Sequence, residues 1–442
     1  MAAPVSEQLR EATRSQHEGL EALPFSIELR TGTVSRASYI AWLRCLRTLF
    51  RAVETAAAAV PALQALAPER ASLLLDDDLA TLDASPHRVL RSAEARAAAA
   101  AQELGLAAED DAFRIAGYQY VLLGSQLGGL VLRRPVGAAL QLEDRGLRFL
   151  RRGEDGGAAR MAAFRAAVDA AVVTDAQVAS ALSGAAAAFS AFGAVMRALS
   201  SPEGDAPHLT ATTLNPDGGT YSIADDPREI DAALRAGLRT LREYPYYVAR
   251  YGQRGRQFTR SDSAWLASLT RNHETIARGQ VQWLAGVLAA RGMPSYLLEQ
   301  HLLVLEEELA AAAPERAPQY RRLGDLARDL ARGRRGVLED TQLHELERSF
   351  EEAVGAELAA ALPRSGFLVG AAVADEGNGR AGAVSSLTSW LGDDGRFPAP
   401  WVRAVLETVS RARRLASKRG PRAAAPAGDS VPARGSVPPS RK

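Results

Sequence analysis

The chain has 442 residues, with 53 basic and 52 acidic side chains, and its 47% apolar and 24% charged residues are ordinary for a globular protein. The composition excludes a disordered or collagen-like chain, and the balanced charge gives no electrostatic argument for nucleic acid as a partner. The length predicts about two or three domains. Cys45 is the only cysteine, which excludes an internal disulfide and a thiolate zinc site and favours the cytoplasm.

No membrane-spanning segment is expected. The longest nearly uncharged stretch, 115–132, contains Gln119, Gln126 and several glycines. The N-terminus lacks a basic segment followed by an apolar core, so no signal peptide is expected either.

Ala, Leu, Arg and Glu recur at helical spacing, and alternating strand patterns are absent, so the sequence predicts an all-α fold. Ser6 can cap the first helix and Ser35 the second. The first helix carries one stripe formed by Leu9, Thr13, His17 and Leu20. Further helices are expected over 87–104, 109–134, 158–172 and 175–199. Together these helices form a predicted domain over 1–203.

Residues 204–226 are rich in proline and glycine and lack apolar periodicity, which predicts a linker. A second helical domain, of unknown role, is expected over 227–416. Its clearest helix runs from Thr259–Asp262 to Gly292. The other predicted helices cover 295–312, 316–333, 339–361 and 400–416. Residues 363–398 are expected to be irregular, and the composition of 417–442 predicts a disordered tail.

His17 is the most informative of the six histidines. It lies on the stripe of the first helix, where a histidine is more often a packed core residue than a ligand. Glu21 follows one turn later, so its carboxylate could receive the Nδ1 proton, directly or through water, and leave Nε2 facing a metal. From these residues alone both interpretations stay open.

The second informative segment is a glycine-rich stretch of an apolar helix, YVLLGSQLGG from Tyr120 to Gly129. Each interior glycine costs about 1 kcal/mol relative to alanine, so three cost roughly 3 kcal/mol of a typical stability of about 5–15 kcal/mol. Gly124 and Gly128 share a face, and the pair Gly128-Gly129 allows a kink. The glycines therefore bring bare backbone close either to a flat ligand or to another helix.

Taken together, the segment Leu9–Thr13 followed by His17, and YVLLGSQLGG about a hundred residues later, resemble the heme oxygenase family, most closely its bacterial branch. The resemblance covers about residues 5–200 and implies a heme-oxygenase-like helical domain. It implies that His17 is the proximal ligand of the heme iron and that Glu21 supports it. The residues implied to lie over the distal face of the heme are Gly124, Gly128 and Gly129.

The resemblance also assigns roles around the rest of the heme. Arg10 and Arg165 would contact the propionates, Tyr120 is similar to a bacterial propionate-binding tyrosine, and Phe189 matches a distal aromatic residue. Ser125 stands where animal members carry an aspartate that organises water for proton delivery. Similar bacterial members also have serine there, so activity is still expected, with Ser125 taking part in the water network.

The implied function is conversion of heme, dioxygen and reductant to biliverdin, carbon monoxide and ferrous iron, with heme as both cofactor and substrate. The chain has no flavin fingerprint and too few cysteines for an iron–sulfur cluster, so an external electron donor, a ferredoxin or a reductase, is expected. A bacteriophytochrome is a candidate acceptor of biliverdin. The alternative is a non-catalytic heme- or bilin-binding carrier or sensor that kept the fold.

Two features of the second domain leave alternatives open. Aromatic residues and arginines are mixed from Tyr244 to Phe258, which could bind an anionic planar ligand such as a bilin or heme, or form a charged helix edge. His273 and His301 lie on apolar helical faces at a spacing comparable to that of a globin-like heme site, although the rest of a globin pattern is missing.

Overall fold

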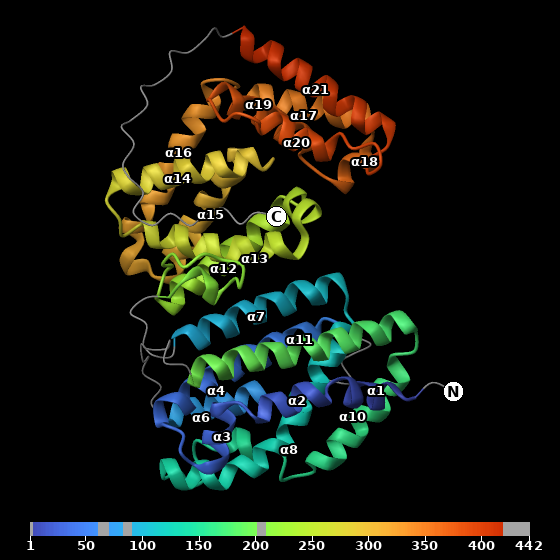
Figure 1. Ribbon diagram of the computed structural model, residues 1–442, viewed down its shortest axis with the longest axis vertical. Helices are drawn as coiled ribbons and strands as arrows, with labels where there is room; N and C mark the ends of the chain where they lie inside the picture. Colours follow the sequence, from blue (N-terminus) through green and yellow to red (C-terminus); the bar gives the residue numbers. More distant parts are fainter. Residues whose placement is uncertain (1–2, 61–69, 83–90, 201–208, 419–442) are drawn as a thin grey trace. The chain divides into compact units, whose positions relative to one another are not determined.

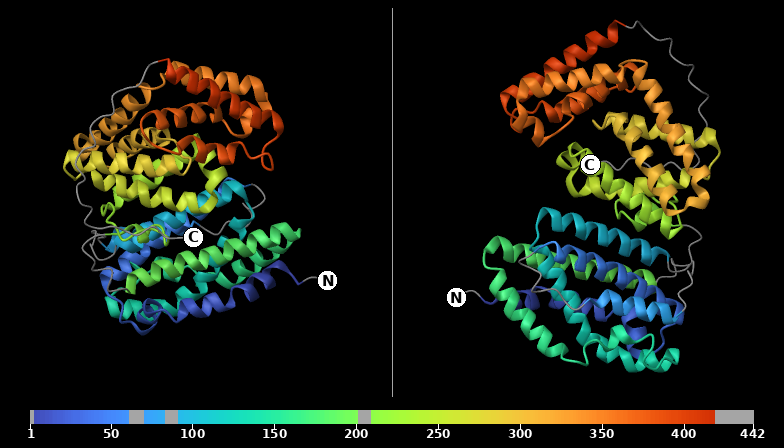
Figure 2. Two further views of the ribbon diagram at one scale, coloured as in Figure 1. Left: turned by 45° about the horizontal axis from the view of Figure 1, so that its top comes forward. Right: turned by 180° about the vertical axis from the view of Figure 1, so that it is seen from behind.

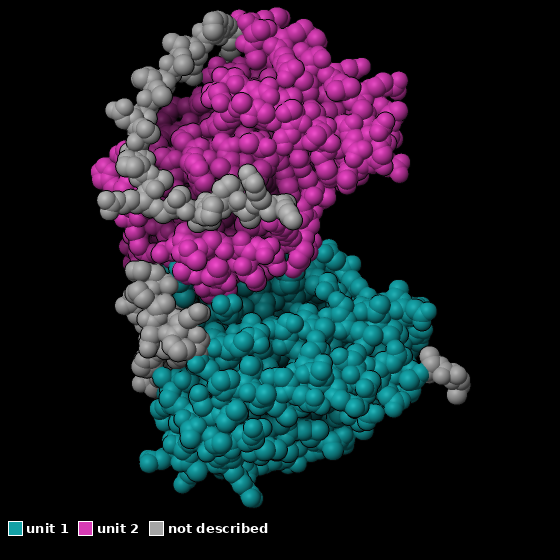
Figure 3. Space-filling view, in the orientation of Figure 1, with its two compact units in different colours: residues 1–209, 225–227 teal, residues 210–224, 228–442 magenta. Residues whose placement is uncertain are grey.

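The structure is a computed structural model that describes residues 3–60, 70–82, 91–200 and 209–418. These residues are helical almost throughout, apart from one isolated antiparallel bridge between Thr210 and Ser222, so the predicted all-α class is confirmed. The chain forms two compact units, one of residues 1–209 and 225–227 and the other of residues 210–224 and 228–442 (Figure 3).

The first unit follows the predicted helices, with additional short ones (Figure 1). The predicted first helix, however, is divided at Thr13 into two helices. Its helices are α1 (Val5–Ala12), α2 (Arg14–Glu21), α3 (Pro24–Thr31), α4 (Arg36–Ala58), α6 (Ala71–Leu82), α7 (Arg91–Asp110), α8 (Arg114–Leu140), α9 (Arg148–Arg151), α10 (Gly157–Ala171) and α11 (Asp175–Ser200).

The two predicted caps have different outcomes. Ser35 caps α4, because its side chain accepts a hydrogen bond from the Ser38 N–H at 3.0 Å. Ser6 does not cap α1, since the helix already begins at Val5 after Pro4. Its N–H and Oγ instead donate to the two carboxylate oxygens of Asp169 at 2.7 and 2.9 Å. This pair of bonds fixes α1 to α10.

The core of the first unit is centred on α8 and α11. Gly117 of α8 faces the backbone of α11 at Ala181–Ala185, and Gly184 of α11 faces the Arg114 carbonyl so closely that a Cβ at either glycine would clash. Both helices are long and apolar enough to cross a membrane by length and composition alone. In this structure they pack on each other, and small residues permit the close contact.

The second unit is also built from helices. They are η3 (Ala211–Thr213), α12 (Pro227–Glu243), α13 (Tyr246–Leu269), α14 (Glu274–Ala290), α15 (Ser295–Ala312), η4 (Pro314–Arg316), α16 (Ala317–Arg335), α17 (Asp340–Val354), α18 (Ala356–Ala361), α19 (Ser365–Gly377), α20 (Ala383–Leu391) and α21 (Ala399–Ser417). Helices α17, α19 and α21 pack on one another (Figure 2).

The helix predicted from 259–262 to Gly292 is wrong, because this region belongs to two helices, α13 and α14. They are separated by a polar turn after Leu269. His273 caps α14 by accepting the Thr275 N–H at 3.4 Å, and Gln319 donates to Thr270 Oγ1 at 2.9 Å. These polar partners stabilise a turn where apolar periodicity alone suggested continuity.

The prediction of irregular structure over 363–398 is also wrong, since this range contains α19 and α20. Helix α19 is buried almost entirely, so it has no polar face to reveal a helical period. Its Gly370 lies against Leu343 and Leu346 of α17, where a Cβ would come within 2.6 and 2.9 Å of their methyl groups. The predicted helix over 339–361 is divided at Gly355, which has a φ of 85°.

The predicted linker over 204–226 includes ordered residues that belong to the second unit. Ala211 and Ile223 are buried, and the Ala224 N–H donates to the Ala264 carbonyl at 2.9 Å. The described proline and glycine residues of this segment lie in turns of the second unit and do not make it an unstructured linker. Residues 204–208 of the predicted linker, and the predicted tail from 419 onwards, lie outside the described residues.

Candidate functional site

His17 projects from α2 on the outside of the first unit. Its side chain is 60% exposed, and so is that of Glu21, whose Oε1 lies 3.7 Å from His17 Nδ1. The prediction that His17 shares a buried face is therefore wrong. Leu9 and Thr13 occupy the buried positions of this stripe, and α2 itself has no buried residue. The carboxylate lies on the Nδ1 side of the ring, which suits an imidazole that uses Nε2 as a ligand.

Phe189 of α11 is the aromatic neighbour of His17. The two ring centroids are 6.0 Å apart, the rings meet edge to face at 74°, and Phe189 is buried. The imidazole is thus held between an anionic group and an aromatic ring. Sequence comparison suggested a distal aromatic residue at this position but gave no sign that it would lie beside His17.

A polar cluster brings together three residues singled out from the sequence, Arg10 of α1, Tyr120 of α8 and Arg165 of α10. Burial raises the pKa of Tyr120, while the charges of Arg165 and Arg10 and a hydrogen bond with the Thr13 side chain act in the opposite direction. Both arginines are exposed at the surface. The cluster is therefore a cationic, hydroxyl-lined patch suited to carboxylates.

Thr13 is the member of this cluster that the sequence did not indicate. It is buried at the junction between α1 and α2, and its hydroxyl lies 2.7 Å from the Leu9 carbonyl. On the sequence it is simply a polar residue on an apolar stripe. Only the position of Tyr120 against this turn shows that Thr13 belongs to the site.

The N-terminal segment meets α8 at two places. Thr13 lies at Tyr120, and Gly32, at the end of α3, lies against Pro135, with a Cβ position 2.8 Å from the Pro135 oxygen. Helices α2 and α3, which connect these two places, therefore run in the same direction as α8 (Figure 1). Between them α2 packs on α11, where His17 lies beside Phe189.

The three predicted glycines do not share one environment. A Cβ at Gly128 would meet nothing within 4 Å, and one at Gly124 would meet only Met161 Cε, at 3.7 Å. A Cβ at Gly129 would lie 2.9 Å from the Leu150 carbonyl oxygen. Gly124 and Gly128 thus leave open space, whereas Gly129 permits packing against α9. The backbone stays helical through all three, so the glycine pair does not interrupt α8.

Apolar side chains extend the open glycine face along α8. Leu127 is 42% exposed and Val131 is 64% exposed, and both fall on the same helical face as Gly124. An exposed apolar strip on the helix that also carries Tyr120 of the cationic cluster has the character of a ligand surface.

The Ser125 side chain does not lie on the open glycine face of α8 and forms hydrogen bonds within the protein. Its Oγ donates to the Leu122 carbonyl at 2.6 Å and accepts from Arg152 Nη2 at 2.7 Å. The Arg152 guanidinium in turn lies over the Phe149 ring, 3.6 Å from its centroid. Arg152 was not singled out from the sequence, because an isolated arginine gives no signal there.

The histidines and arginines noted in the second unit have local partners. His273 is exposed and caps α14, whereas His301 is buried, with its Nδ1 2.9 Å from Thr240 Oγ1 and its Nε2 2.9 Å from Ser263 Oγ. Arg250 donates to the Tyr246 hydroxyl at 2.6 Å and to the Ser386 carbonyl at 2.8 Å. The contacts of His273 and His301 do not resemble a histidine pair that could hold heme. The Arg250 guanidinium is bound within the second unit and is not free for an anionic ligand.

Residues 3–198 match the family model described as heme oxygenase. This N-terminal region belongs to the heme oxygenase family, and the rest of the chain is unassigned. No curated protein matches the chain.

The solved structures that are similar to this chain include two heme oxygenases. One is a heme oxygenase from the cyanobacterium Synechocystis in complex with heme, with 20% identity, a TM-score of 0.40 and coverage of 45% of this chain and 93% of that chain. The other is a heme oxygenase from Leptospira interrogans, with 20% identity, a TM-score of 0.38 and coverage of 44% and 99%, respectively.

The neighbouring glycines Gly128 and Gly129 should respond oppositely to alanine. Gly128→Ala should stabilise the protein by about 0.4–1 kcal/mol, because the new methyl group enters open space and the helix propensity improves. Gly129→Ala should destabilise it by about 1–3 kcal/mol, because the methyl group meets the Leu150 backbone. Denaturant titration of both variants measures the difference. Equal stabilities would contradict the packing assigned to Gly129.

Proposed function

We propose that the first unit is a heme oxygenase, which converts heme with dioxygen and reductant to biliverdin, carbon monoxide and ferrous iron. One observation carries the proposal: Arg10, Tyr120 and Arg165 come together from three helices of a unit that also presents the exposed imidazole of His17 and the open glycine face of α8. An imidazole for iron, cations for two propionates and bare backbone beside an apolar strip form a set of groups that fits heme.

In this proposal the residues of the first unit bind and orient the substrate. His17 Nε2 would hold the heme iron, and Glu21 on the Nδ1 side favours the tautomer that leaves Nε2 unprotonated. Arg10, Arg165 and the Tyr120 hydroxyl hold the propionates. Bound heme supplies the iron centre and is itself the molecule oxidised.

The open face of α8 accounts for the space that the reaction needs. Gly124 and Gly128 allow the helix backbone to approach a flat ligand, and Leu127 and Val131 exclude water from its surroundings. Because the Ser125 hydroxyl already has two protein partners, backbone groups and other polar groups are proposed to order the water that delivers protons.

The proposed reaction needs electrons from outside the chain. Cys45, the only cysteine, is fully buried in α4, so it offers no cluster ligands at the surface. A ferredoxin or a reductase is the proposed donor, and a bacteriophytochrome is a proposed acceptor of biliverdin. The proposed location is the cytoplasm, with no nucleic acid or membrane as partner.

Turnover of added hemin tests the proposal directly. Purified protein mixed with hemin should develop a Soret band of a histidine-ligated complex. Addition of ascorbate, or of ferredoxin with its reductase, should convert that band into the spectrum of biliverdin, and released carbon monoxide should be detectable. Stable bound heme, with no biliverdin under either reductant, would contradict the proposed activity.

Such a result would favour the second candidate, a non-catalytic heme- or bilin-binding carrier or sensor. The observation in its favour is the engagement of Ser125 by Leu122 and Arg152, which keeps this hydroxyl from acting freely in proton delivery. Such a carrier or sensor would use His17 and the cationic cluster to bind heme, and it would need no path for delivering protons to the bound heme.

A further inference from the structure

The second unit contains a cavity among α12, α13, α14 and α15. The empty volume inside and at the mouth of this cavity is about 570 Å³, part of it open to solvent. Most of its wall is apolar, formed by residues that include Leu241, Leu266, Leu284, Met293 and Leu297. Tyr244 and Tyr247 add aromatic surface.

One acidic side chain lines this apolar wall. Asp262 of α13 accepts a hydrogen bond from the Tyr221 hydroxyl at 3.1 Å. Burial raises the pKa of Asp262 to about 6, against the opposing effects of Tyr221, Arg291 and Ser261. The carboxylate is thus poorly solvated for an ionised group, and a cation or a strong N–H donor in the cavity would stabilise it.

The other polar groups on the wall are already engaged. His301 lies between the hydroxyls of Thr240 and Ser263, and burial lowers its pKa to about 4, so the ring is neutral near pH 7. The Tyr244 hydroxyl pairs with that of Tyr296 at 3.2 Å. Asp262 is therefore the polar group on the wall that a positively charged ligand would stabilise most.

We propose that this cavity is a binding site for a small, largely apolar molecule of one or two rings that carries a protonated amine, with the amine directed at Asp262. The leucine and methionine side chains cover the apolar part of such a ligand, and the tyrosine rings provide faces toward which a cation is attracted. This site is independent of the heme oxygenase activity proposed for the first unit.

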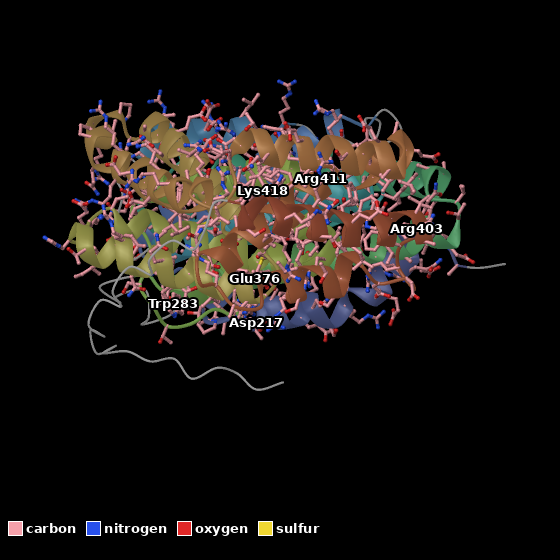
Figure 4. All side chains as sticks on the ribbon, turned by 90° about the horizontal axis from the view of Figure 1, so that it is seen from above. Asp217, Trp283, Glu376, Arg403, Arg411 and Lys418 are labelled. Atoms are coloured by element: carbon pink, nitrogen blue, oxygen red, sulfur yellow. The ribbon has the colours of Figure 1, made fainter. Side chains whose placement is uncertain are left out.

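Calorimetry on the full chain, without heme, tests the site with three probes of similar size: benzylamine, toluene and benzoate. Benzylamine should bind most tightly, because toluene lacks the charge and benzoate is repelled by Asp262. Asp262→Asn should weaken benzylamine at least tenfold and leave toluene unchanged. The matched control is Asp217→Asn, at an exposed aspartate labelled in Figure 4, which should change neither.

A second variant tests the location. Leu288 lines the cavity from α14, and Leu288→Phe should weaken both benzylamine and toluene by filling it. Ile276→Phe on the same helix is the control, since Ile276 is 55% exposed and lies away from the cavity wall. Circular dichroism checks folding. The proposal would be overturned if benzylamine does not bind saturably, or if it binds no better than benzoate. It would also be overturned if benzylamine binds Asp262→Asn as tightly as the parent protein. The comparison of the three probes uses the parent protein alone, so it holds even if a variant does not fold.

The pH dependence adds an independent readout. Benzylamine affinity should rise between pH 5 and pH 7.5, as Asp262 ionises while an alkyl amine stays protonated. The ionisable groups that face Asp262 are Tyr221, Tyr247 and Arg291, whose charges stay constant over this interval, and His301 on the same wall is already neutral. Affinity that is flat or falls with pH would contradict pairing with Asp262.

Discussion

Replacing His17 with alanine should abolish the histidine-ligated heme spectrum and lower turnover by roughly 100-fold or more, since even loss of an outer-shell partner of a metal ligand typically costs about 10–100-fold. His17 is exposed and packs only at its ring edge against Phe189, so the fold should survive the substitution. This separates a ligand from a structural histidine, because a structural role would appear as lost stability with an unchanged spectrum.

The measurement is hemin titration followed by reductant, monitored through the Soret band. His273→Ala is the matched control, because His273 is also exposed but caps a helix of the second unit. Added imidazole should partly restore the spectrum of His17→Ala by entering the space of the missing ring. A His17→Ala protein with the parent's heme spectrum would rule out His17 as the ligand.

Gly184→Ala should be one of the two most destabilising single methyl additions at a glycine of the α8–α11 contact, together with Gly117→Ala. The added Cβ would collide with the Arg114 carbonyl, and backbone cannot move aside as a flexible side chain does. The expected loss is about 3 kcal/mol, the upper part of the range for overpacked cores. For a unit of this size such a loss corresponds to a fall in Tm of roughly 6–12 °C.

Gly105→Ala is the control, because Gly105 lies within α7 and a Cβ there meets nothing within 4 Å. It should be neutral or slightly stabilising, by up to about 1 kcal/mol. The thermal transition of the first unit, followed by circular dichroism, gives the comparison. Equal Tm values for the two variants would show that α8 and α11 are not packed through Gly184 as described.

Heme binding is expected to be more sensitive than stability to the cationic cluster. The cluster consists of Arg10 of α1, Tyr120 of α8 and Arg165 of α10, and both arginines are exposed. Because exposed charges contribute little to folding, their presence beside the half-buried Tyr120 points to a ligand rather than to the stability of the unit.

The sequence by itself determined the helical class and most of the long helices, because apolar side chains at helical spacing record which face of a helix is buried. It also determined the family, through His17 and the string from Tyr120 to Gly129. Local chemistry was enough at Ser35, whose hydroxyl accepts the Ser38 N–H and caps α4, but not at Ser6, which a distant carboxylate, Asp169, engages instead. Apart from the contact of Ser6, these features depend on neighbours close in the chain.

Only the tertiary structure decided the features that depend on distant neighbours. Gly128 and Gly129 are adjacent and chemically identical, yet one faces open space and the other the backbone of Leu150. Helix α19 was hidden from the sequence because it is buried on all sides and so shows no period. Likewise, the sequence around Asp262 does not reveal the apolar cavity, because α12, α14 and α15 supply half of the residues that line it.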